Sequence, residues 1–292
     1  MTLEIDSERA CDLAGRLHLF FPHPQMPEDI LPKGLDQHSP EYRIFLTLVV
    51  AIDYNRDADK LWAAARRAHE RQETRYLFNP NDLLRRPSHE VEQDLRQSGL
   101  LASPPDFQTW RTLARSFHER FKGDPLNLLK ACDMEGPRIL QYLRSHGRDF
   151  PYLKGQKIGP LWLRMLRDNA GISLEKLEDI PIPVDIHVLR STLCLGVMTG
   201  DYEGPIDSLK EPITEIWKRA VKNLVVTDAK DHRPVISLDL DEILWTIGRT
   251  YCNKRTLGTT NTSCPGFPGC AEGRISVSRE KVIVHTKKGR IL

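Results

Sequence analysis

The sequence predicts an all-α fold that ends in a small C-terminal β-hairpin. Apolar residues recur every three to four positions in most segments, as expected for helices that bury one face. Turns with Gly and Pro divide these segments into short helices, which is typical of domains packed through helix–helix contacts. The tail differs, because RISVSREKVIVHTKKGRIL, residues 274–292, alternates apolar and polar side chains and predicts a hairpin.

The expected helices follow in chain order. Residues 3–21 carry apolar side chains on one side, and residues 39–71 are strongly periodic throughout. Within the second segment, EYRIFLTLVVAI is apolar enough for a buried core helix. Ser88 is a predicted N-cap and Gly99 a predicted helix end. Further helices are expected in SPPDFQTWRTLARSFHERFKGD, DPLNLLKAC, GPRILQYLRSHG, the segment after LKGQKIGP, the segment after Asp185, and LDLDEILWTIGRTYC.

The size and charge of the chain set broad limits. With 292 residues and a net charge of +2, the chain can bury a substantial core and is not a uniformly basic tail. The first twenty residues lack the features of a signal peptide, and no apolar stretch reaches the roughly 18 residues that span a bilayer. We therefore expect a soluble intracellular protein with no membrane partner. The predicted domains are residues 39–180, residues 1–38 together with 181–272, and the hairpin tail 273–292.

A glycine-containing turn opens one predicted helix in YLKGQKIGPLWLRML, residues 152–166. Gly155 and Gly159 let a partner approach the backbone, and the start of a helix presents N–H groups and the positive end of its dipole. Lys154 and Lys157 add positive charge beside them. The turn is therefore a candidate phosphate-binding site, although many turns of this kind only join two helices.

A second stretch, IPIPVDIHVLR, residues 180–190, changes from extended chain to helix. Pro181 and Pro183 hold the chain extended, and the apolar spacing after them predicts a helix. Asp185 stands at the start of that helix, where an aspartate commonly accepts hydrogen bonds from backbone N–H groups. The residue is either a plain helix cap or a carboxylate held in place for chemistry.

These two stretches resemble the helix–hairpin–helix DNA glycosylase superfamily, which includes endonuclease III and the adenine and 8-oxoguanine glycosylases. In that superfamily a hairpin with a Gly-x-Lys step precedes an apolar helix, a loop and a PVD-x-H-V-x-R-like segment. Gly155-Gln156-Lys157 and residues 183–190 stand at those places, and the IPIPVD stretch is most similar to the archaeal 8-oxoguanine glycosylases. The resemblance covers roughly residues 40–272 and implies a two-lobed helix–hairpin–helix fold. Two departures are Leu153 at the hairpin's usual first glycine and a longer Lys-to-Asp connection.

The resemblance implies a base-excision-repair DNA glycosylase with AP lyase activity. Lys157 would attack the sugar C1′ and form a Schiff base, and Asp185 would stabilise charge at the sugar as the glycosidic bond breaks. Lys154 is the rival nucleophile, because one shift in the hairpin alignment would put it in the same place. The implied partner is duplex DNA with an oxidised base, 8-oxoguanine first. The enzyme would be a monomer in the cytoplasm, associated with the nucleoid.

Other residues are candidates for contact with DNA. His187 and Arg190, just behind Asp185, would support the helix or bind a phosphate. An enzyme that acts on a base inside a duplex must flip that base out. In the superfamily, residues after the first core helix fill the gap, which makes Tyr54, Asn55 and Arg56 the candidates here. A polar helix end without this role explains the same three residues equally well.

The cysteines suggest a cofactor. Cys252, Cys264 and Cys270 match three of the four thiolates that bind a 4Fe–4S iron–sulfur cluster in endonuclease III-like proteins. Asn261 stands where the second thiolate is expected, so a cluster would need another ligand, such as Cys11. A zinc ion with mixed ligands and a loop that has lost its iron are the two other interpretations.

Two alternatives to a bifunctional enzyme stay open at this stage. The chain could be a monofunctional glycosylase for another lesion, in which Lys157 contacts only a phosphate. It could also be a nucleic-acid-binding protein that keeps the hairpin but has lost catalysis. Covalent trapping of a Schiff base separates the first reading from both of these.

Overall fold

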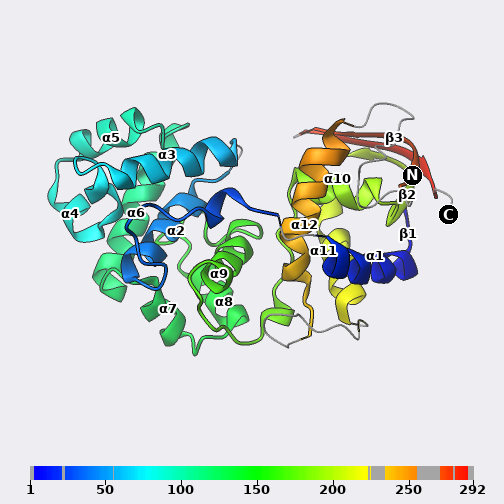
Figure 1. The fold of residues 1–292 in the computed structure, drawn as a ribbon, viewed down its shortest axis with the longest axis horizontal. Coiled ribbons are helices and arrows are strands. Elements are labelled where there is room, and N and C mark those ends of the chain that lie inside the picture. Colours follow the sequence, from blue (N-terminus) through cyan, green and yellow to red (C-terminus); the bar gives the residue numbers. More distant parts are fainter. Residues whose placement is uncertain are drawn as a thin grey trace. The chain divides into compact units, whose positions relative to one another are not determined.

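The computed structural model describes residues 3–21, 24–54, 56–222, 224, 234–254, 270–278 and 280–288 (Figure 1). The α-helices are α1 (Ser7–Phe20), α2 (Pro40–Ala51), α3 (Ala58–Glu70), α4 (Pro80–Arg85), α5 (Ser88–Gln97), α6 (Pro104–Phe121), α7 (Pro125–Ala131), α8 (Gly136–Ser145), α9 (Ile158–Asp168), α10 (Ile186–Cys194), α11 (Asp207–Lys222) and α12 (Asp241–Thr246). The strands are β1 (Leu3–Ile5), β2 (Met198–Gly204), β3 (Glu272–Val277) and β4 (Val282–Lys287). Single-turn elements are η1 (Pro27–Asp29), η2 (Arg75–Phe78), η3 (Leu177–Asp179), η4 (Ser237–Leu240), the π-turn η5 (Ile247–Tyr251) and η6 (Cys252–Lys254).

The chain packs into two compact units. The first, here called the hairpin unit, is Gln25–Asp179 and holds helices α2–α9. The second, the sheet unit, is Met1–Pro24 with Ile180–Leu292 and holds α1, α10–α12 and the strands. The domain division expected from the sequence stays a prediction, because compactness does not show which segments fold independently.

Helix α2 forms the core of the hairpin unit. It is buried on all sides from Tyr42 to Ala51, as the EYRIFLTLVVAI segment predicted, and Phe45, Leu46 and Leu48 are almost fully buried. Trp162 of α9 is also fully buried, and its Nε1 donates to Thr47 Oγ1 on α2 at 2.8 Å. Trp162 is thus a core residue with its one polar group satisfied, which is how a buried tryptophan is normally accommodated.

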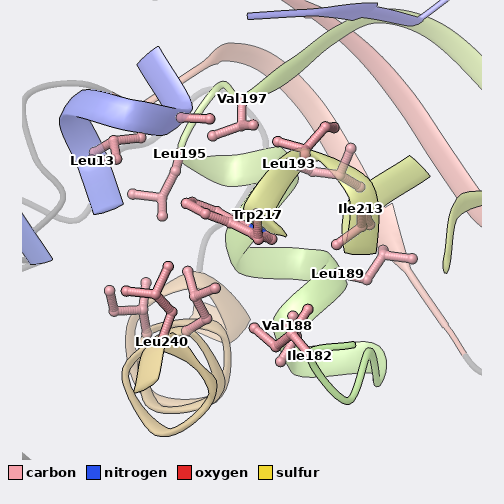
Figure 2. Packing of buried hydrophobic residues seen from close by; sticks show 14 of the residues in the cluster. Leu13, Ile182, Val188, Leu189, Leu193, Leu195, Val197, Ile213, Trp217 and Leu240 are labelled. Atoms are coloured by element: carbon pink, nitrogen blue, oxygen red, sulfur yellow. The ribbon is translucent and has the colours of Figure 1, made fainter. Parts of the chain in front are cut away.

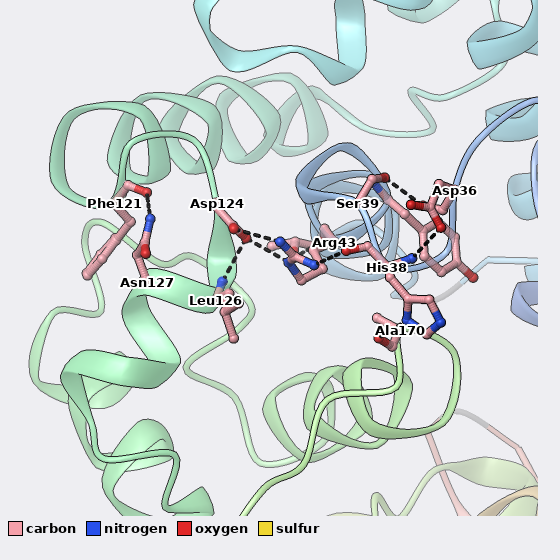
Figure 3. Close-up of polar contacts among 11 residues, drawn as sticks. Asp36, His38, Ser39, Arg43, Phe121, Asp124, Leu126, Asn127 and Ala170 are labelled. Carbon is pink, nitrogen blue, oxygen red and sulfur yellow. Dashed lines mark hydrogen bonds and ion pairs between the residues drawn. The ribbon is translucent and has the colours of Figure 1, made fainter.

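A mostly buried ion pair ties α2 to the start of α7 (Figure 3). Arg43 donates from Nε and Nη2 to the two carboxylate oxygens of Asp124 at 2.8 and 2.7 Å. The third nitrogen, Nη1, donates to the carbonyl of His38 at 2.5 Å. Asp124 also caps α7 by accepting from the Leu126 N–H at 2.9 Å. One carboxylate therefore begins a helix and holds it to the central helix of the unit.

The strongly periodic residues 39–71 form two helices, separated at the IDYNRD segment. Helix α2 ends at Ala51, where the N–H groups of Ile52 and Asp53 bind carbonyls three residues back. Helix α3 begins anew at Ala58, because the Asp57 side chain accepts from the Lys60 N–H at 3.3 Å. The Asp57 cap therefore starts a second helix, although the apolar residues of both helices have the same spacing.

The core of the sheet unit lies between its helices and one face of its sheet. Leu189 and Leu193 of α10 pack with Trp217 of α11, which is fully buried (Figure 2). The indole Nε1 of Trp217 donates to Thr192 Oγ1 at 2.9 Å. From the sheet, Val282 and Val284 of β4 join this cluster. The helix after Asp185 is therefore embedded in the core of its unit along most of its length.

The sheet is antiparallel in the order β1-β2-β4-β3. The predicted C-terminal hairpin is present as β3 and β4, with Val277 opposite Val282. Strand β2, which the sequence pattern did not reveal, pairs with β4 from Gly200 opposite Thr286 to Gly204 opposite Val282. The hairpin is thus half of a larger sheet.

The expectation that the first helix starts at residue 3 is wrong. Leu3–Ile5 pair with β2 as strand β1, with Ile5 opposite Met198. Asp6 then begins α1 by accepting from the Arg9 N–H at 3.1 Å. With these corrections the predicted fold class is confirmed: the described chain is mostly helical and carries a C-terminal antiparallel hairpin. Over the described ranges, none of the helices has the length and apolarity needed to cross a membrane.

Candidate nucleic-acid site

The turn between α8 and α9 is held mainly by its own backbone. The Phe150 carbonyl accepts from Lys154 N at 3.2 Å, and the Gly155 carbonyl accepts from Gly159 N at 3.2 Å. Leu153, which stands where the superfamily has its first hairpin glycine, is fully buried. The substitution therefore gives the turn an apolar anchor in the core of the hairpin unit.

The two predicted glycines are explained by close contacts within the turn. A Cβ at Gly159 would lie 2.6 Å from the Leu153 carbonyl oxygen and 2.9 Å from Leu140 Cδ2. A Cβ at Gly155 would lie 3.0 Å from the Tyr152 carbonyl oxygen. Gly159 in particular lets α9 touch the turn that precedes it. Whether either glycine also contacts a DNA phosphate stays a prediction.

The two candidate lysines lie on either side of Gly155. Lys157 is half-buried at the N-cap position of α9, with helical backbone angles. Lys154 is exposed, and its side chain lies across Gly147, where an added Cβ would be 2.6 Å from Lys154 Cδ. The amine of Lys157 thus belongs to the first turn of a helix, whereas Lys154 belongs to the turn before it.

Asp185 begins α10 in the way the sequence predicted. Its Oδ1 accepts from the backbone N–H groups of His187 at 2.8 Å and Val188 at 3.0 Å. The residue has an extended backbone, consistent with the two prolines before it, and its side chain is half-buried. The carboxylate is therefore both a helix cap and a group with a fixed orientation at the surface of the sheet unit.

Arg190 is buried and binds the backbone of its own unit. Its side chain donates from Nη1 to the Gly248 carbonyl at 3.2 Å and from Nη2 to the Val277 carbonyl at 3.3 Å. Nη1 also lies 3.3 Å from Nδ1 of the half-buried His187. Burial lowers the pKa of the Arg190 guanidinium, while Cys194, Cys252 and Asp185 oppose that shift. Arg190 thus joins α10 to η5 and β3, and its predicted contact with DNA stays a prediction, as does that of His187.

Gly248 touches the backbone of α10 beside Asp185. A Cβ at Gly248 would lie 2.0 Å from the carbonyl oxygen of His187 and 2.6 Å from its carbonyl carbon. The glycine lies in the π-turn η5, an irregularity that is frequent at functional sites. The sequence showed Gly248 only as part of GRTY, and no local signal marked its contact with residue 187.

A tryptophan and an arginine lie next to His187. The Trp245 ring meets the His187 ring edge-on, with centroids 5.3 Å apart, and the Arg249 guanidinium lies 4.7 Å from the centre of the Trp245 ring. Both Trp245 and Arg249 are half-buried. The spacing of four residues on one helix could have suggested their contact, but not their position beside the start of α10.

The three candidates for filling a base gap have different surroundings. Arg56 is mostly buried, donates to the carbonyls of Leu100 at 2.7 Å and Gly99 at 3.2 Å, and lies 3.7 Å from Asp106. Tyr54 is 52% exposed, and its ring lies 5.7 Å from that of Tyr152. Asn55 lies outside the described residues. Tyr54 therefore has the exposure expected of a base contact, whereas Arg56 holds its loop to the protein.

Two of the three predicted metal ligands are described, and both are buried in the sheet unit. Cys252 begins η6, and Cys270 comes just before β3. Cys264 and Asn261 lie outside the described residues. Within the described ranges, His, Cys, Asp and Glu side chains form no group of three or more that could hold a metal ion. The iron–sulfur cluster therefore stays a prediction.

Comparison with known protein families adds an independent observation. The family model AGOG, described as N-glycosylase/DNA lyase, matches residues 163–264. This range starts within α9 and contains Asp185, His187 and Arg190, but not the turn that carries Lys157. The match confirms the resemblance to the helix–hairpin–helix DNA glycosylases and the expected enzyme class, a DNA glycosylase with lyase activity. No curated protein matches the chain.

Proposed function

We propose that this chain, an N-glycosylase/DNA lyase that resembles the helix–hairpin–helix glycosylases, removes an oxidised purine from duplex DNA. The first substrate to test is 8-oxoguanine, because the IPIPVD stretch is most similar to the archaeal 8-oxoguanine glycosylases. Lys157 is the nucleophile in this mechanism, and Asp185 assists it.

The geometry of Asp185 is the observation that carries the proposal. Two backbone N–H groups bind one of its oxygens and set the direction of the carboxylate before any substrate arrives. A charge that is oriented in advance stabilises a developing opposite charge without a cost of reorganisation in the transition state. A half-exposed carboxylate at a helix start can therefore stabilise positive charge on a sugar as its bond to the base breaks.

The reaction needs a nucleophile as well as this charge. The neutral amine of Lys157 attacks C1′ of the damaged nucleotide, and the base leaves with the electron pair of the glycosidic bond. Loss of the amine proton and opening of the sugar ring give a Schiff base between Nζ and C1′. Removal of a proton from C2′ then expels the 3′ phosphate and cuts the strand. The departing base or solvent takes up the protons, so atoms and charge balance.

Binding of the DNA backbone is assigned to the hairpin. Lys154, together with the backbone near Gly155 and Gly159, lies at the start of α9, where the helix dipole favours an anion. Tyr54, Asn55 and Arg56 stay in the proposal as the residues that fill the gap left by the flipped base, with Arg56 acting through the loop that it holds. His187, which follows Asp185 in the sheet unit, is suited to bind a phosphate of the DNA.

The remaining parts of the proposal concern the state of the protein. The enzyme acts as a monomer. It works in the cytoplasm and in contact with the nucleoid, because chromosomal DNA is its substrate. A 4Fe–4S cluster at Cys252, Cys264 and Cys270 would need a fourth ligand, and its role would be structural. Measurement of iron in an anaerobic preparation tests the cluster separately from activity.

Borohydride trapping tests the catalytic proposal directly. Wild type, Lys157→Ala, Lys154→Ala and Asp185→Asn are incubated with duplexes that contain 8-oxoguanine, thymine glycol, uracil or an abasic site. We expect a covalent complex with wild type and Lys154→Ala, none with Lys157→Ala, and slower formation with Asp185→Asn. Lys154→Ala is the matched control, since it removes a lysine three residues away in the same turn.

The other outcomes identify the alternatives. Trapping by Lys157→Ala but not by Lys154→Ala would move the nucleophile to Lys154. Excision without trapping would indicate a monofunctional glycosylase. Salt-sensitive DNA binding with no excision of any base would indicate a binding protein that lacks turnover.

A further inference from the structure

The hairpin turn carries one acidic residue among several basic ones. Residues 146–157 contain the acid Asp149 together with Arg148, Lys154 and Lys157. Arg148 and Lys154 are exposed, and Asp149 is half-exposed. A carboxylate without a partner at this place would repel DNA phosphates and would also compete with them for the nearby cations. The group that binds the Asp149 carboxylate therefore affects how well the turn can hold DNA.

Arg120, at the end of α6, binds this carboxylate. Its Nη1 donates to Asp149 Oδ2 at 2.6 Å, and its Nη2 donates to the hydroxyl of Tyr142 on α8. The guanidinium carbon lies 5.5 Å from the centre of the Tyr142 ring and 6.0 Å from that of Phe150. The arginine thus contacts the helix before the turn and the first part of the turn at the same time. The planar shape of its guanidinium fixes the direction of both hydrogen bonds.

The backbone around Asp149 is held without Arg120. The N–H groups of Asp149 and Phe150 bind the His146 carbonyl at 2.9 and 3.2 Å. The Phe150 side chain is fully buried, and its ring lies 5.6 Å from that of Phe117. The Phe150 carbonyl accepts from Lys154 N at 3.2 Å. The core of the hairpin unit therefore sets the course of the chain, and the direction of the Asp149 carboxylate is what the arginine adds.

The ion pair lies at the surface. The side chain of Arg120 is 34% exposed and that of Asp149 is 45% exposed. Ion pairs with this degree of exposure contribute little to the stability of a fold. Their charges nevertheless act on a charged ligand that binds nearby, most strongly at low salt. The pair is thus better suited to set the charge of the DNA-facing turn than to hold the protein together.

We propose that Arg120 is a positioning residue for DNA binding, which neutralises Asp149 and holds its carboxylate against the end of α6. Arg148 and Lys154 are then left to bind phosphates. This rests on the proposed function in taking the hairpin as the element that binds the DNA backbone. Without Arg120, the carboxylate is released towards these cations and its charge opposes the phosphates. Arg120 thus acts through Asp149 and does not touch the reacting atoms.

Equilibrium binding to one duplex tests the proposal. The duplex carries a tetrahydrofuran abasic analogue, and binding is measured by fluorescence anisotropy at low and at raised salt. The proteins are wild type, Arg120→Gln, Arg120→Lys, Asp149→Asn and the double variant Arg120→Gln with Asp149→Asn. Arg115→Gln is the matched control, because Arg115 is an exposed arginine five residues earlier on the same helix. Thermal melts establish that each variant is folded.

Arg120→Gln should weaken binding about fivefold at low salt, the factor for two like charges about 4 Å apart in water. The loss should shrink as salt is raised. The double variant should bind within about twofold of wild type, because the carboxylate that Arg120 controls is gone. Asp149→Asn alone should bind at least as tightly as wild type. Arg120→Lys keeps the charge and Arg115→Gln leaves the pair intact, so both should bind within about twofold of wild type.

A purely structural role of the ion pair gives a different pattern. It would make the double variant as weak as Arg120→Gln, and Asp149→Asn alone would be weakened as well. Either result would overturn the proposal, as would wild-type binding by Arg120→Gln or equal weakening by Arg115→Gln. Asp149→Asn keeps the test decisive if Arg120→Gln does not fold, because weaker binding by this variant is sufficient to contradict the role of Arg120.

Lys154→Ala and borohydride trapping separate failure of this proposal from failure of the proposed function. Weaker binding by Lys154→Ala, with wild-type binding by Arg120→Gln, would keep the hairpin as the phosphate site and remove the role of Arg120. If neither variant is weakened although wild type traps, the phosphate site is elsewhere and the role of Arg120 falls with it. A wild type that traps no duplex but shows the expected pattern of binding would keep the role of Arg120 and remove the lysine mechanism.

Discussion

The helices that carry the two proposed catalytic residues begin in different ways. Helix α9 has Lys157 at its N-cap position, and the lysine ammonium group, which can only donate hydrogen bonds, cannot accept one from a backbone N–H group. Helix α10 begins at Asp185, whose carboxylate accepts two backbone N–H groups. The proposed catalytic residue of α9 is therefore not the group that stabilises the start of its helix. At the start of α10 one side chain, Asp185, has both roles. The buried polar contacts of α9, at Trp162 and Arg164, lie further along the helix, whereas Asp185 of α10 acts in the first turn itself.

Breaking the buried ion pair behind α9 should have the largest effect. Arg164 of α9 is 1% exposed and donates to Glu28, 4% exposed, at 2.6 Å. Burial raises the pKa of Glu28, and Arg164 opposes that shift. Arg164→Met leaves the carboxylate buried without its partner and should lower the free energy of unfolding by about 3–5 kcal/mol, measured by urea denaturation.

The double variant Glu28→Gln with Arg164→Met is the control for this prediction. It removes the stranded charge, so it should recover a large part of the stability lost by the single variant. Equal stability of the single and double variants would show that lost packing, and not the unpaired carboxylate, accounts for the effect.

A methyl group at Gly248 should disturb α10 where Asp185 caps it. The Cβ of Gly248→Ala would lie 2.0 Å from the His187 carbonyl oxygen, so either η5 or the first turn of α10 must move. We expect a loss of about 1–3 kcal/mol in the free energy of unfolding. Excision should fall as well, because His187 N binds Asp185. The measurements are urea denaturation and single-turnover excision under conditions where the variant is folded.

Gly15→Ala is the matched control in the same unit. Its Cβ would meet only the end of a flexible side chain, Leu224 Cδ2, at 3.3 Å. It should leave excision unchanged. If Gly248→Ala keeps the excision rate of wild type, the contact with His187 does not position Asp185.

Substitutions at the two helix starts test the comparison itself. Asp185→Ala removes the cap and should cost about 1 kcal/mol of stability, whereas Asp185→Asn keeps an acceptor and should cost a few tenths. Lys157→Ala should leave stability unchanged within about 0.5 kcal/mol, since this lysine does not cap α9. Thermal melts of the three variants measure their stability, and borohydride trapping measures their formation of the Schiff base. A large loss of stability in Lys157→Ala would mean that α9 also depends on its first residue.

The smallest expected effect is the loss, at acidic pH, of the stabilisation that Asp124 gives as the cap of α7. Burial alone would raise the pKa of Asp124, but hydrogen bonds from Arg43 and the Leu126 N–H outweigh it and lower the pKa below 3.8. The stabilisation is therefore fully present above pH 3.8 and is lost as the pH falls through the folded-state pKa. The gap in urea midpoint between wild type and Asp124→Asn should shrink from about pH 5 to about pH 3. A constant gap would show that ionisation of Asp124 does not contribute.

Much of the local structure around the candidate site was accessible from sequence. The prolines before Asp185, the apolar spacing after it and the Gly-x-Lys turn each act within about four residues, which is the range over which helices start and stop. The same reasoning correctly placed α10, α9 and the C-terminal hairpin. The resemblance to the glycosylases also rested on short motifs, and the family match covers the one that contains Asp185 but not the turn.

Tertiary structure decided the features that depend on distant partners. Residues 3–5 became a strand because β2, almost two hundred residues away, offered an edge, although their own apolar spacing suited a helix. Arg190 and Arg56 bind the carbonyls of Gly248, Val277 and Leu100, and no local pattern in the sequence marks these distant partners. The Tyr54–Tyr152 pair likewise exists only because the turn packs beside the end of α2. Capping and periodicity are local, whereas burial and pairing are settled by the whole fold, so the sequence determined the helix starts and the tertiary structure chose their surroundings.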